Sequence, residues 1–176
     1  MAKKKKKPTR SKLRPPKGPG FEKLSAVNGL SLPVLFHSLW DNKLWRQPED
    51  ELIAQLMPWL TGPIDFLLDA RSIRSESLGK LADIPLAAHF REYRGSTSDD
   101  CPDLPWLDVD LHVMIACNRH YGDDLGVAMD YRSSTTDPRV VGSKWVSTTK
   151  KDFDHIEWTV ISNTFSEFAH SLGFAG

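Results

Sequence analysis

The sequence predicts an α+β fold in which helices precede an antiparallel sheet and one further helix closes the chain. Three observations lead to this fold class. Apolar residues between positions 48 and 95 recur at helical spacing, and those between 109 and 160 alternate as in strands. The strand-like segments follow one another through short turns without intervening helices, which favours a meander of about four or more strands. We therefore expect a single domain over residues 21–176, with the C-terminal helix packed on the sheet.

The predicted helical half starts near Pro48, whose fixed φ suits a first turn and which precedes three acidic residues at the positive end of the helix dipole. The apolar positions that follow are one turn apart: Leu52, Leu56 and Leu60. Residues 61–63 end this helix and open a second one through the apolar stretch 64–70, which the polar segment 71–80 continues. A third helix is expected over residues 83–95, ended by Gly95.

Four strands are predicted in the second half, at residues 109–118, 125–132, 139–146 and 156–160. In the first of them Cys117 lies on the buried face with Val113, so we expect it to be a core residue rather than a reactive thiol. His112 lies on the opposite face, which predicts partial exposure. Turns are expected over residues 118–124 and 133–138.

The closing helix has its own start signal, because Thr164 followed by Glu167 forms a capping box. Phe165, Phe168 and Leu172 make its apolar face. Gly173 is expected to end it.

The first 20 residues differ in composition from the rest. They carry nine basic residues and no acid, whereas the remainder carries the other 14 basic residues and all 23 acidic ones, a formal charge of −9. Four prolines and a single large apolar residue predict a disordered tail. Its cations could bind nucleic acid phosphates or another anionic surface, or the tail could be a solubilising extension. The principal anion-binding candidates are Lys3, Lys4, Lys5, Lys6, Lys7 and Arg10.

Composition also bounds the class of protein. Two cysteines, Cys101 and Cys117, are too few for a disulfide scaffold, and no apolar run is long enough to span a bilayer. The charged N-terminus has no apolar segment behind it, as a secretory signal would have. These features predict a cytoplasmic protein.

The loop before the first strand is rich in acids, and its members are partner-binding candidates: Asp99, Asp100, Asp103, Asp108 and Asp110. A solvated acidic face is the first interpretation, with a weak calcium site or a docking surface for a basic partner as alternatives. The spacing is not that of an EF-hand, because Leu104 stands where the loop needs glycine. No paired cysteine or histidine motif predicts a metal, and we expect no cofactor.

We find no catalytic constellation in the sequence. It lacks a nucleophile elbow, a phosphate loop, a dinucleotide fingerprint and an RNA-binding signature. The adjacent acids Asp123 and Asp124 stand in a turn, where such pairs usually bind backbone N–H groups. We therefore expect no enzyme, with a hydrolase that uses this turn or the acidic loop kept as an alternative.

Residues 103–175 resemble the SUKH superfamily, which includes Knr/Smi-like cell-wall-assembly regulators and many bacterial immunity proteins. The matching features are a Gly-Asp turn, an Asp-Tyr strand end, the Asp-Pro-Arg-Val-Val segment 137–141, a later tryptophan and phenylalanines on the last helix. The matching residues are Gly122, Asp123, Asp130, Tyr131, Trp145, Phe165 and Phe168. The resemblance implies that they define the fold, as a glycine turn, acids that tie it and packed aromatic residues.

The resemblance implies a binding fold with no shared catalytic set. Bacterial members look like antidotes that bind and neutralise a toxin, and fungal members look like regulators. The acidic body suits a positively charged partner. The leading hypothesis is thus a non-enzymatic immunity-type or regulatory protein, and the alternative is a nucleic-acid- or ribosome-associated protein that acts through the tail.

Overall fold

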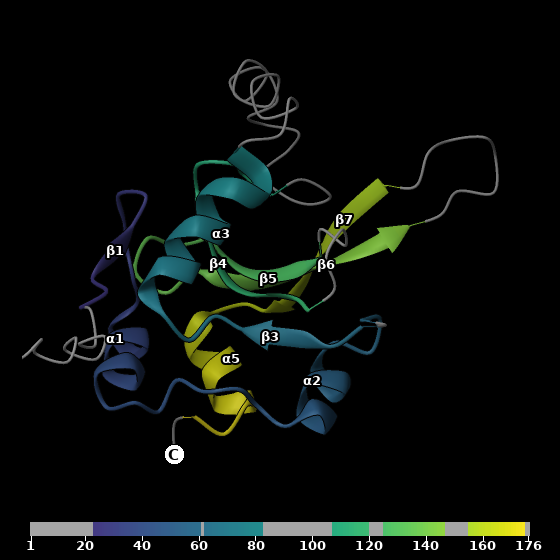
Figure 1. Ribbon diagram of the computed structural model, residues 1–176, viewed down its shortest axis with the longest axis horizontal. Helices are drawn as coiled ribbons and strands as arrows, with labels where there is room; N and C mark the ends of the chain where they lie inside the picture. The colour runs from purple at the N-terminus through teal and green to yellow at the C-terminus, as the bar shows by residue number, and fades with distance from the viewer. Residues whose placement is uncertain (1–22, 61, 83–106, 120–124, 147–154, 175–176) are drawn as a thin grey trace, which may run out of the picture.

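The computed structural model describes residues 23–60, 62–82, 107–119, 125–146 and 155–174 (Figure 1). The predicted tail, the helix at 83–95, the loop at 96–105 and most of the turn at 118–124 lie outside these residues. Within them the α+β fold class is confirmed, with four helices, a five-stranded sheet and a two-stranded hairpin. No described helix is long and apolar enough to cross a membrane.

The main sheet is an antiparallel meander in which every strand pairs with its neighbours in sequence. Its order is β3 (Ile64–Phe66), β4 (His112–Asn118), β5 (Gly126–Asp130), β6 (Arg139–Val146) and β7 (His155–Ser162). The third predicted strand has the observed bounds. The first begins three residues later than predicted, because residues 108–111 form a turn before it.

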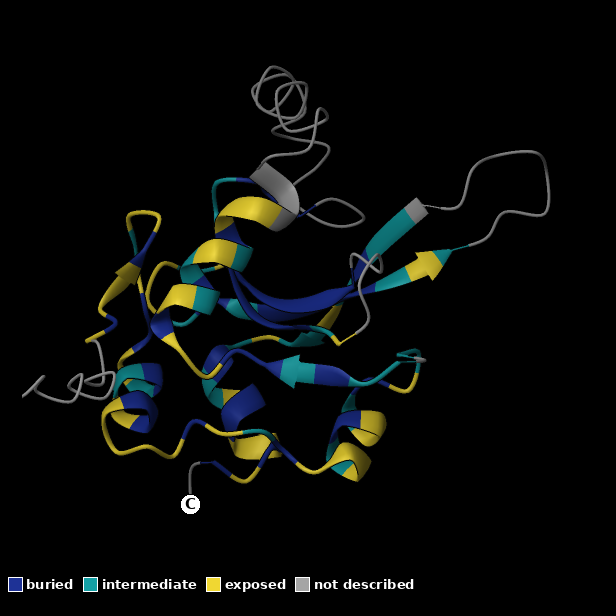
Figure 2. Cartoon of the chain, viewed as in Figure 1, coloured by how far each residue is buried: buried dark blue, intermediate teal, exposed yellow. Residues whose placement is uncertain are grey.

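Helices lie on both faces of this sheet (Figure 1). Helix α3 (Ala70–Ala82) packs on β4 from one side, where Glu76 lies 3.7 Å from the Sγ of Cys117. Helices α1 (Val34–Asp41), α2 (Asp50–Leu56) and α5 (Phe165–Ser171) lie on the other side. Strands β4 and β5 are therefore buried almost throughout, as Figure 2 shows, whereas the sequence predicted one buried face.

The core on the α5 side is aromatic. Phe36 of α1 lies 5.6 Å from Phe165 between ring centroids, and Phe66 of β3 stacks on Phe168 at 6.3 Å. Trp45 lies between them, 5.1 Å from Phe66. These contacts bring the N-terminal helix, the first strand of the sheet and the closing helix together around one cluster.

The Thr164 half of the predicted capping box is confirmed, whereas the Glu167 side chain binds Ser162 instead of the Thr164 N–H. The Thr164 hydroxyl accepts a hydrogen bond from the Glu167 N–H at 3.0 Å, and the Glu167 carboxylate accepts one from the Ser162 hydroxyl at 3.2 Å. Gly173 ends the helix with a φ of +71°. Phe165, Phe168 and Leu172 are all buried.

The prediction of helix over residues 64–70 is wrong for its first part. Ile64 and Phe66 are buried, whereas Asp65 between them in the sequence is half-buried. The segment pairs with β4 as an edge strand. The helix begins only at Ala70, where the Asp69 carboxylate accepts bonds from both the N–H and the hydroxyl of Ser72. The helix before it is also shorter than predicted, since α2 ends at Leu56 and excludes Leu60.

Two N-terminal features were not predicted. Strands β1 (Ala26–Val27) and β2 (Leu30–Ser31) form a hairpin, and α1 follows it. The hairpin turn is Asn28-Gly29, with φ values of 53° and 83°. An Asn-Gly pair is a strong hairpin signal because both turn positions need positive φ.

Candidate functional site

Strands β6 and β7 extend beyond the rest of the sheet (Figure 1). The last pair between β5 and β6 is Val127 with Gly142, whereas β6 and β7 remain paired as far as Val146 and His155. Within the described ranges, the outer half of β6 therefore has a strand neighbour on one side only. It forms a two-stranded ribbon with the beginning of β7.

Trp145 lies in this ribbon, opposite Ile156, and its exposed fraction is 44%. The expectation that Trp145 is a packed aromatic residue is therefore wrong. The physical reason is where β5 begins: its first pair with β6 joins Val127 to Gly142, so β5 does not lie beside Trp145. A tryptophan that is nearly half exposed on a strand is unusual, since large apolar side chains are generally covered.

The two sides of the ribbon differ in chemistry. Trp145 shares its side with Ile156 and with the 36% exposed Val160, because alternate residues of a strand lie on the same face. The other side carries an ion pair, with Lys144 Nζ 3.6 Å from Glu157 Oε2. We call this side, with Trp145, Ile156 and Val160, the ribbon surface. On it the buried Trp158 separates Ile156 from Val160, which lies opposite Val141 where β5 also pairs with β6.

A buried charge cluster lies at the opposite end of β5 and β6. The fully buried Asp130 carboxylate accepts hydrogen bonds from Arg132 Nη2 at 2.8 Å and Arg139 Nη2 at 2.9 Å. Both arginine side chains are largely buried, with 11% and 14% exposed. Burial raises the pKa of Asp130, but the two guanidinium groups outweigh it and leave the pKa below its usual value. The cluster ties β5 to β6.

Tyr131 connects the sheet to the N-terminal hairpin. Its hydroxyl donates a hydrogen bond to the carbonyl of Ser31 at 2.9 Å, and burial raises the pKa of the phenol. Of the residues that carry the family resemblance, Asp130, Tyr131, Phe165 and Phe168 are buried. Gly122 and Asp123 lie outside the described residues.

Asp108 does not belong to the solvated face that the composition of the acidic loop predicts. This residue is 3% exposed, and its Oδ1 accepts bonds from the N–H groups of Asp110 and Leu111. It is therefore the acceptor of a local turn rather than a docking residue. Asp110 is half-buried. The other candidates, Asp99, Asp100 and Asp103, lie outside the described residues.

His112 is also more buried than predicted, with 1% exposed. It faces the interior because helix α3 covers its side of β4. Its Nδ1 lies 2.8 Å from the carbonyl of Asp108, and its buried Nε2 has no hydrogen-bond partner among the described residues. Burial lowers the pKa of the imidazole, against a smaller opposing effect of that carbonyl and the nearby carboxylates.

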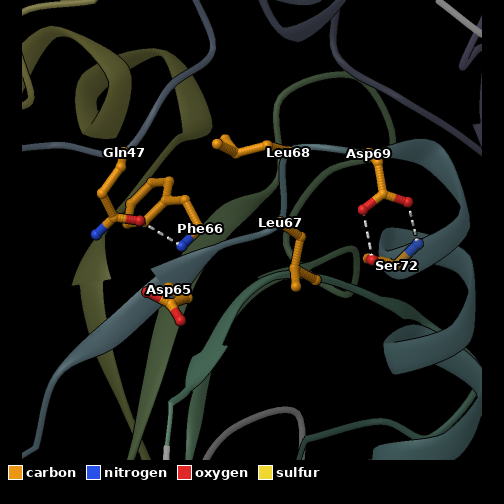
Figure 3. A pocket seen from close by; sticks show the side chains of 7 residues that line it. All are labelled: Gln47, Asp65, Phe66, Leu67, Leu68, Asp69 and Ser72. Atoms are coloured by element: carbon orange, nitrogen blue, oxygen red, sulfur yellow. Dashed lines mark hydrogen bonds between the residues drawn. The ribbon is translucent and has the colours of Figure 1, made fainter. Parts of the chain in front are cut away.

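A hollow of about 370 Å³ lies beside β3 (Figure 3). It is lined by Gln47, Asp65, Phe66, Leu67, Leu68, Asp69 and Ser72. The polar side chains in it already have partners: Asp69 binds Ser72, and Asp65 binds Arg119. Gln47 binds the backbone of β3 on its outer edge, donating to Ile64 O at 2.8 Å and accepting from Phe66 N at 2.7 Å. The contact between Ser72 and Asp69 lies at the first turn of α3.

Within the part of the chain that the structure describes, no group of three or more His, Cys, Asp or Glu residues is placed to hold a metal ion. The acids of the predicted hydrolase turn, Asp123 and Asp124, lie outside that part, as do the tail lysines. The most distinctive candidate site is therefore the ribbon surface. The sequence identified its strands but not its exposure, because exposure depends on where β5 begins.

No family model, curated protein or solved structure matches this chain.

Proposed function

We propose that this chain is a cytoplasmic, non-catalytic protein-binding module and that its partner docks on the ribbon surface. The observation that supports the proposal is the 44% exposed Trp145, beside the partly buried Ile156 and the exposed Val160. Tryptophan is enriched among the residues that dominate binding energy at protein interfaces. A flat apolar strand face with one charged border is suited to another protein surface rather than to a small ligand, which needs a concave pocket.

The resemblance to the SUKH superfamily supports an expectation about the partner. It favours an immunity-type antitoxin or a regulatory protein that binds and neutralises or controls another protein. The charge of −9 on residues 21–176 favours a basic partner, such as a toxin domain that acts on nucleic acid. The proposed action is steric: the module covers its partner's working surface.

A pull-down from the source organism tests the proposal, with the wild-type chain and Trp145→Ala as baits. Leu78→Ala is the matched control, because Leu78 lies on α3, away from the ribbon, and is 53% exposed. We expect Trp145→Ala to lose most of the captured protein and Leu78→Ala to retain it. A growth assay with a co-expressed candidate toxin extends the test to neutralisation. Equal capture by both variants contradicts the proposed surface.

The basic tail supports a second candidate function, which is association with nucleic acid or the ribosome. Nine cations and no acid within the first 20 residues form a dense positive segment. A chain without residues 2–17 should then lose RNA and DNA binding, and binding by the full chain should weaken steeply with salt. Binding that survives the deletion excludes the tail as its cause.

A further inference from the structure

We infer that this chain binds a second copy of itself through antiparallel pairing of the two β7 edges, which joins the two ribbon surfaces into one. The inference rests on the proposed function of the ribbon surface as a protein-binding surface, because the joined surface is the one that the heterologous partner contacts.

The two edge strands of the sheet differ in whether side chains bind their outer backbone groups. At β3 the amide of Gln47 binds Ile64 O and Phe66 N, the groups that an incoming strand would use. The indole of Trp45 donates to Leu67 O at 3.0 Å beside them. At the other end of the sheet β7 has β6 as its strand neighbour, and no strand of the described residues lies beyond it. Side chains therefore occupy the backbone groups of the three-residue edge strand β3, and the eight-residue strand β7 forms the other edge of the sheet.

The composition of β7 favours strand pairing. Four of its eight residues are β-branched: Ile156, Thr159, Val160 and Ile161. The strand contains no proline and no lysine, which are the residues that commonly protect an exposed edge. A long edge of this kind is a template for another strand.

Self-pairing brings the exposed residues into register. In an antiparallel sheet, two residues that lie opposite each other on neighbouring strands are on the same face. Successive residues of one strand alternate between faces, so two identical β7 strands can pair only if the twofold axis passes through a residue and not between two residues. An axis at Trp158 places Ile156 opposite Val160 of the second copy. Because Trp145 is the neighbour of Ile156 and Val141 the neighbour of Val160, one row then runs Trp145, Ile156, Val160 and Val141 across the dimer. Val160 thereby gains a lateral apolar neighbour, whereas Trp145 lies one strand away from the junction.

Charge allows the same arrangement. With the axis at Trp158, Glu157 lies opposite Thr159 of the second copy, so the two Glu157 carboxylates do not face each other. Each Glu157 keeps Lys144 as its ion-pair partner within its own chain.

The first test is the mass of the full chain in solution, measured by light scattering and sedimentation equilibrium. We expect twice the 19.9 kDa of one chain at high concentration, with dissociation on dilution. Val160→Lys should raise the dissociation constant of the dimer at least about tenfold, because it places a charge opposite Ile156 in the row that joins the two copies. Val34→Lys is the control, since Val34 is 84% exposed on α1. Circular dichroism checks that both variants fold. A wild-type mass of one chain at all concentrations overturns the inference.

The second test is cross-linking that reports the register. In a Cys101→Ser background, Ile156→Cys with Val160→Cys should form a disulfide-linked dimer under mild oxidation, and each cysteine alone should form far less. Efficient linkage of Ile156→Cys with Ser162→Cys instead overturns the axis at Trp158.

The two proposals fail separately. If the chain is monomeric but Trp145→Ala still loses its captured protein, the dimer is wrong and the binding surface stands. If the chain dimerises and Trp145→Ala captures as well as the wild type, the heterologous partner does not use this surface and the dimer stands.

Discussion

Ser77 and Met114 join helix α3 to the sheet, because the Ser77 hydroxyl accepts a hydrogen bond at 2.9 Å from the backbone N–H of Met114. The same hydroxyl donates to the carbonyl of Ile73 at 2.6 Å. The bond lies where the pairing of β4 with β5 shifts register, between Met114 and Ala116. Both residues are fully buried, so no water can replace the serine.

We predict that Ser77→Ala lowers the free energy of unfolding by about 1–3 kcal/mol, because it removes the hydroxyl acceptor of a buried N–H. Urea denaturation followed by tryptophan fluorescence measures the loss. Ser171→Ala is the control, since this exposed serine makes the same type of bond back to Glu167 of its own helix. Its expected change is within about 0.5 kcal/mol. Equal effects of the two variants would mean that the bond to the sheet contributes nothing measurable.

Asp130 is predicted to be the most sensitive charge in the described part of the chain. Asp130→Asn leaves Arg132 and Arg139 largely buried without their carboxylate, and breaking a buried pair in this way costs about 3–5 kcal/mol. Because the folded pKa of Asp130 lies below its unfolded value, its stabilisation is present above about pH 4 and is lost as the pH falls through the folded pKa.

Denaturant titrations between neutral pH and pH 3 test both statements. The control is Asp65→Asn, whose partner Arg119 is half exposed, and its effect at neutral pH should be far smaller. The difference between wild type and Asp130→Asn should shrink on acidification. A difference that is independent of pH would show that the arginines do not act through the carboxylate charge.

His112 should make the fold sensitive to mild acid. Its folded pKa lies below the unfolded value of about 6.5, so between these two values the unfolded chain takes up a proton that the folded chain does not. Stability should therefore fall as the pH drops below about 6.5, by at most about 1.4 kcal/mol per pH unit for this one group.

His112→Phe tests the effect, because phenylalanine keeps a ring in the site but cannot be protonated. The variant loses the contact with the Asp108 carbonyl, so its stability at pH 8 serves as its own reference. We expect a flatter stability profile than wild type between pH 5 and 6.5. Profiles that run parallel would place the acid sensitivity at another histidine.

The sequence predicted the fold class because its strongest signals are local. Strand β6 has the bounds that the sequence predicts, and Thr164 marks the start of α5. The strand β3 was misread because a short apolar run has no distinctive period. It becomes a strand through its pairing with β4, 50 residues later in the sequence, which no local pattern contains.

Exposure was the property that local patterns predicted least well. His112 was expected on an open face and is buried, because α3 covers that face. Trp145 was expected in the core and is exposed, because β5 begins only at Gly126 and its pairing with β6 reaches only Gly142. Both errors have the same cause: the burial of a strand residue depends on the length and position of elements distant in sequence.

Two glycines provide a last prediction, because they differ in what surrounds them. A Cβ on Gly126 would lie 2.8 Å from the carbonyl oxygen of Ala116 and 2.4 Å from the end of the Met114 side chain. The methionine can move, but the backbone oxygen cannot without opening the pairing of β4 with β5. Gly126→Ala should therefore destabilise the fold by about 1–3 kcal/mol.

Gly79 is the matched control, since it lies on the exposed side of α3 and a Cβ there meets no atom within 4 Å. Alanine has the higher helix propensity, so Gly79→Ala should stabilise the fold by about 0.5–1 kcal/mol. Thermal and urea denaturation of the two variants should thus move in opposite directions from wild type. The Gly126 N–H also donates a hydrogen bond to the Ser143 hydroxyl at 2.7 Å, which helps to hold this end of β5 in place. A stabilised Gly126→Ala variant would therefore contradict a rigid pairing of β4 with β5 at this point.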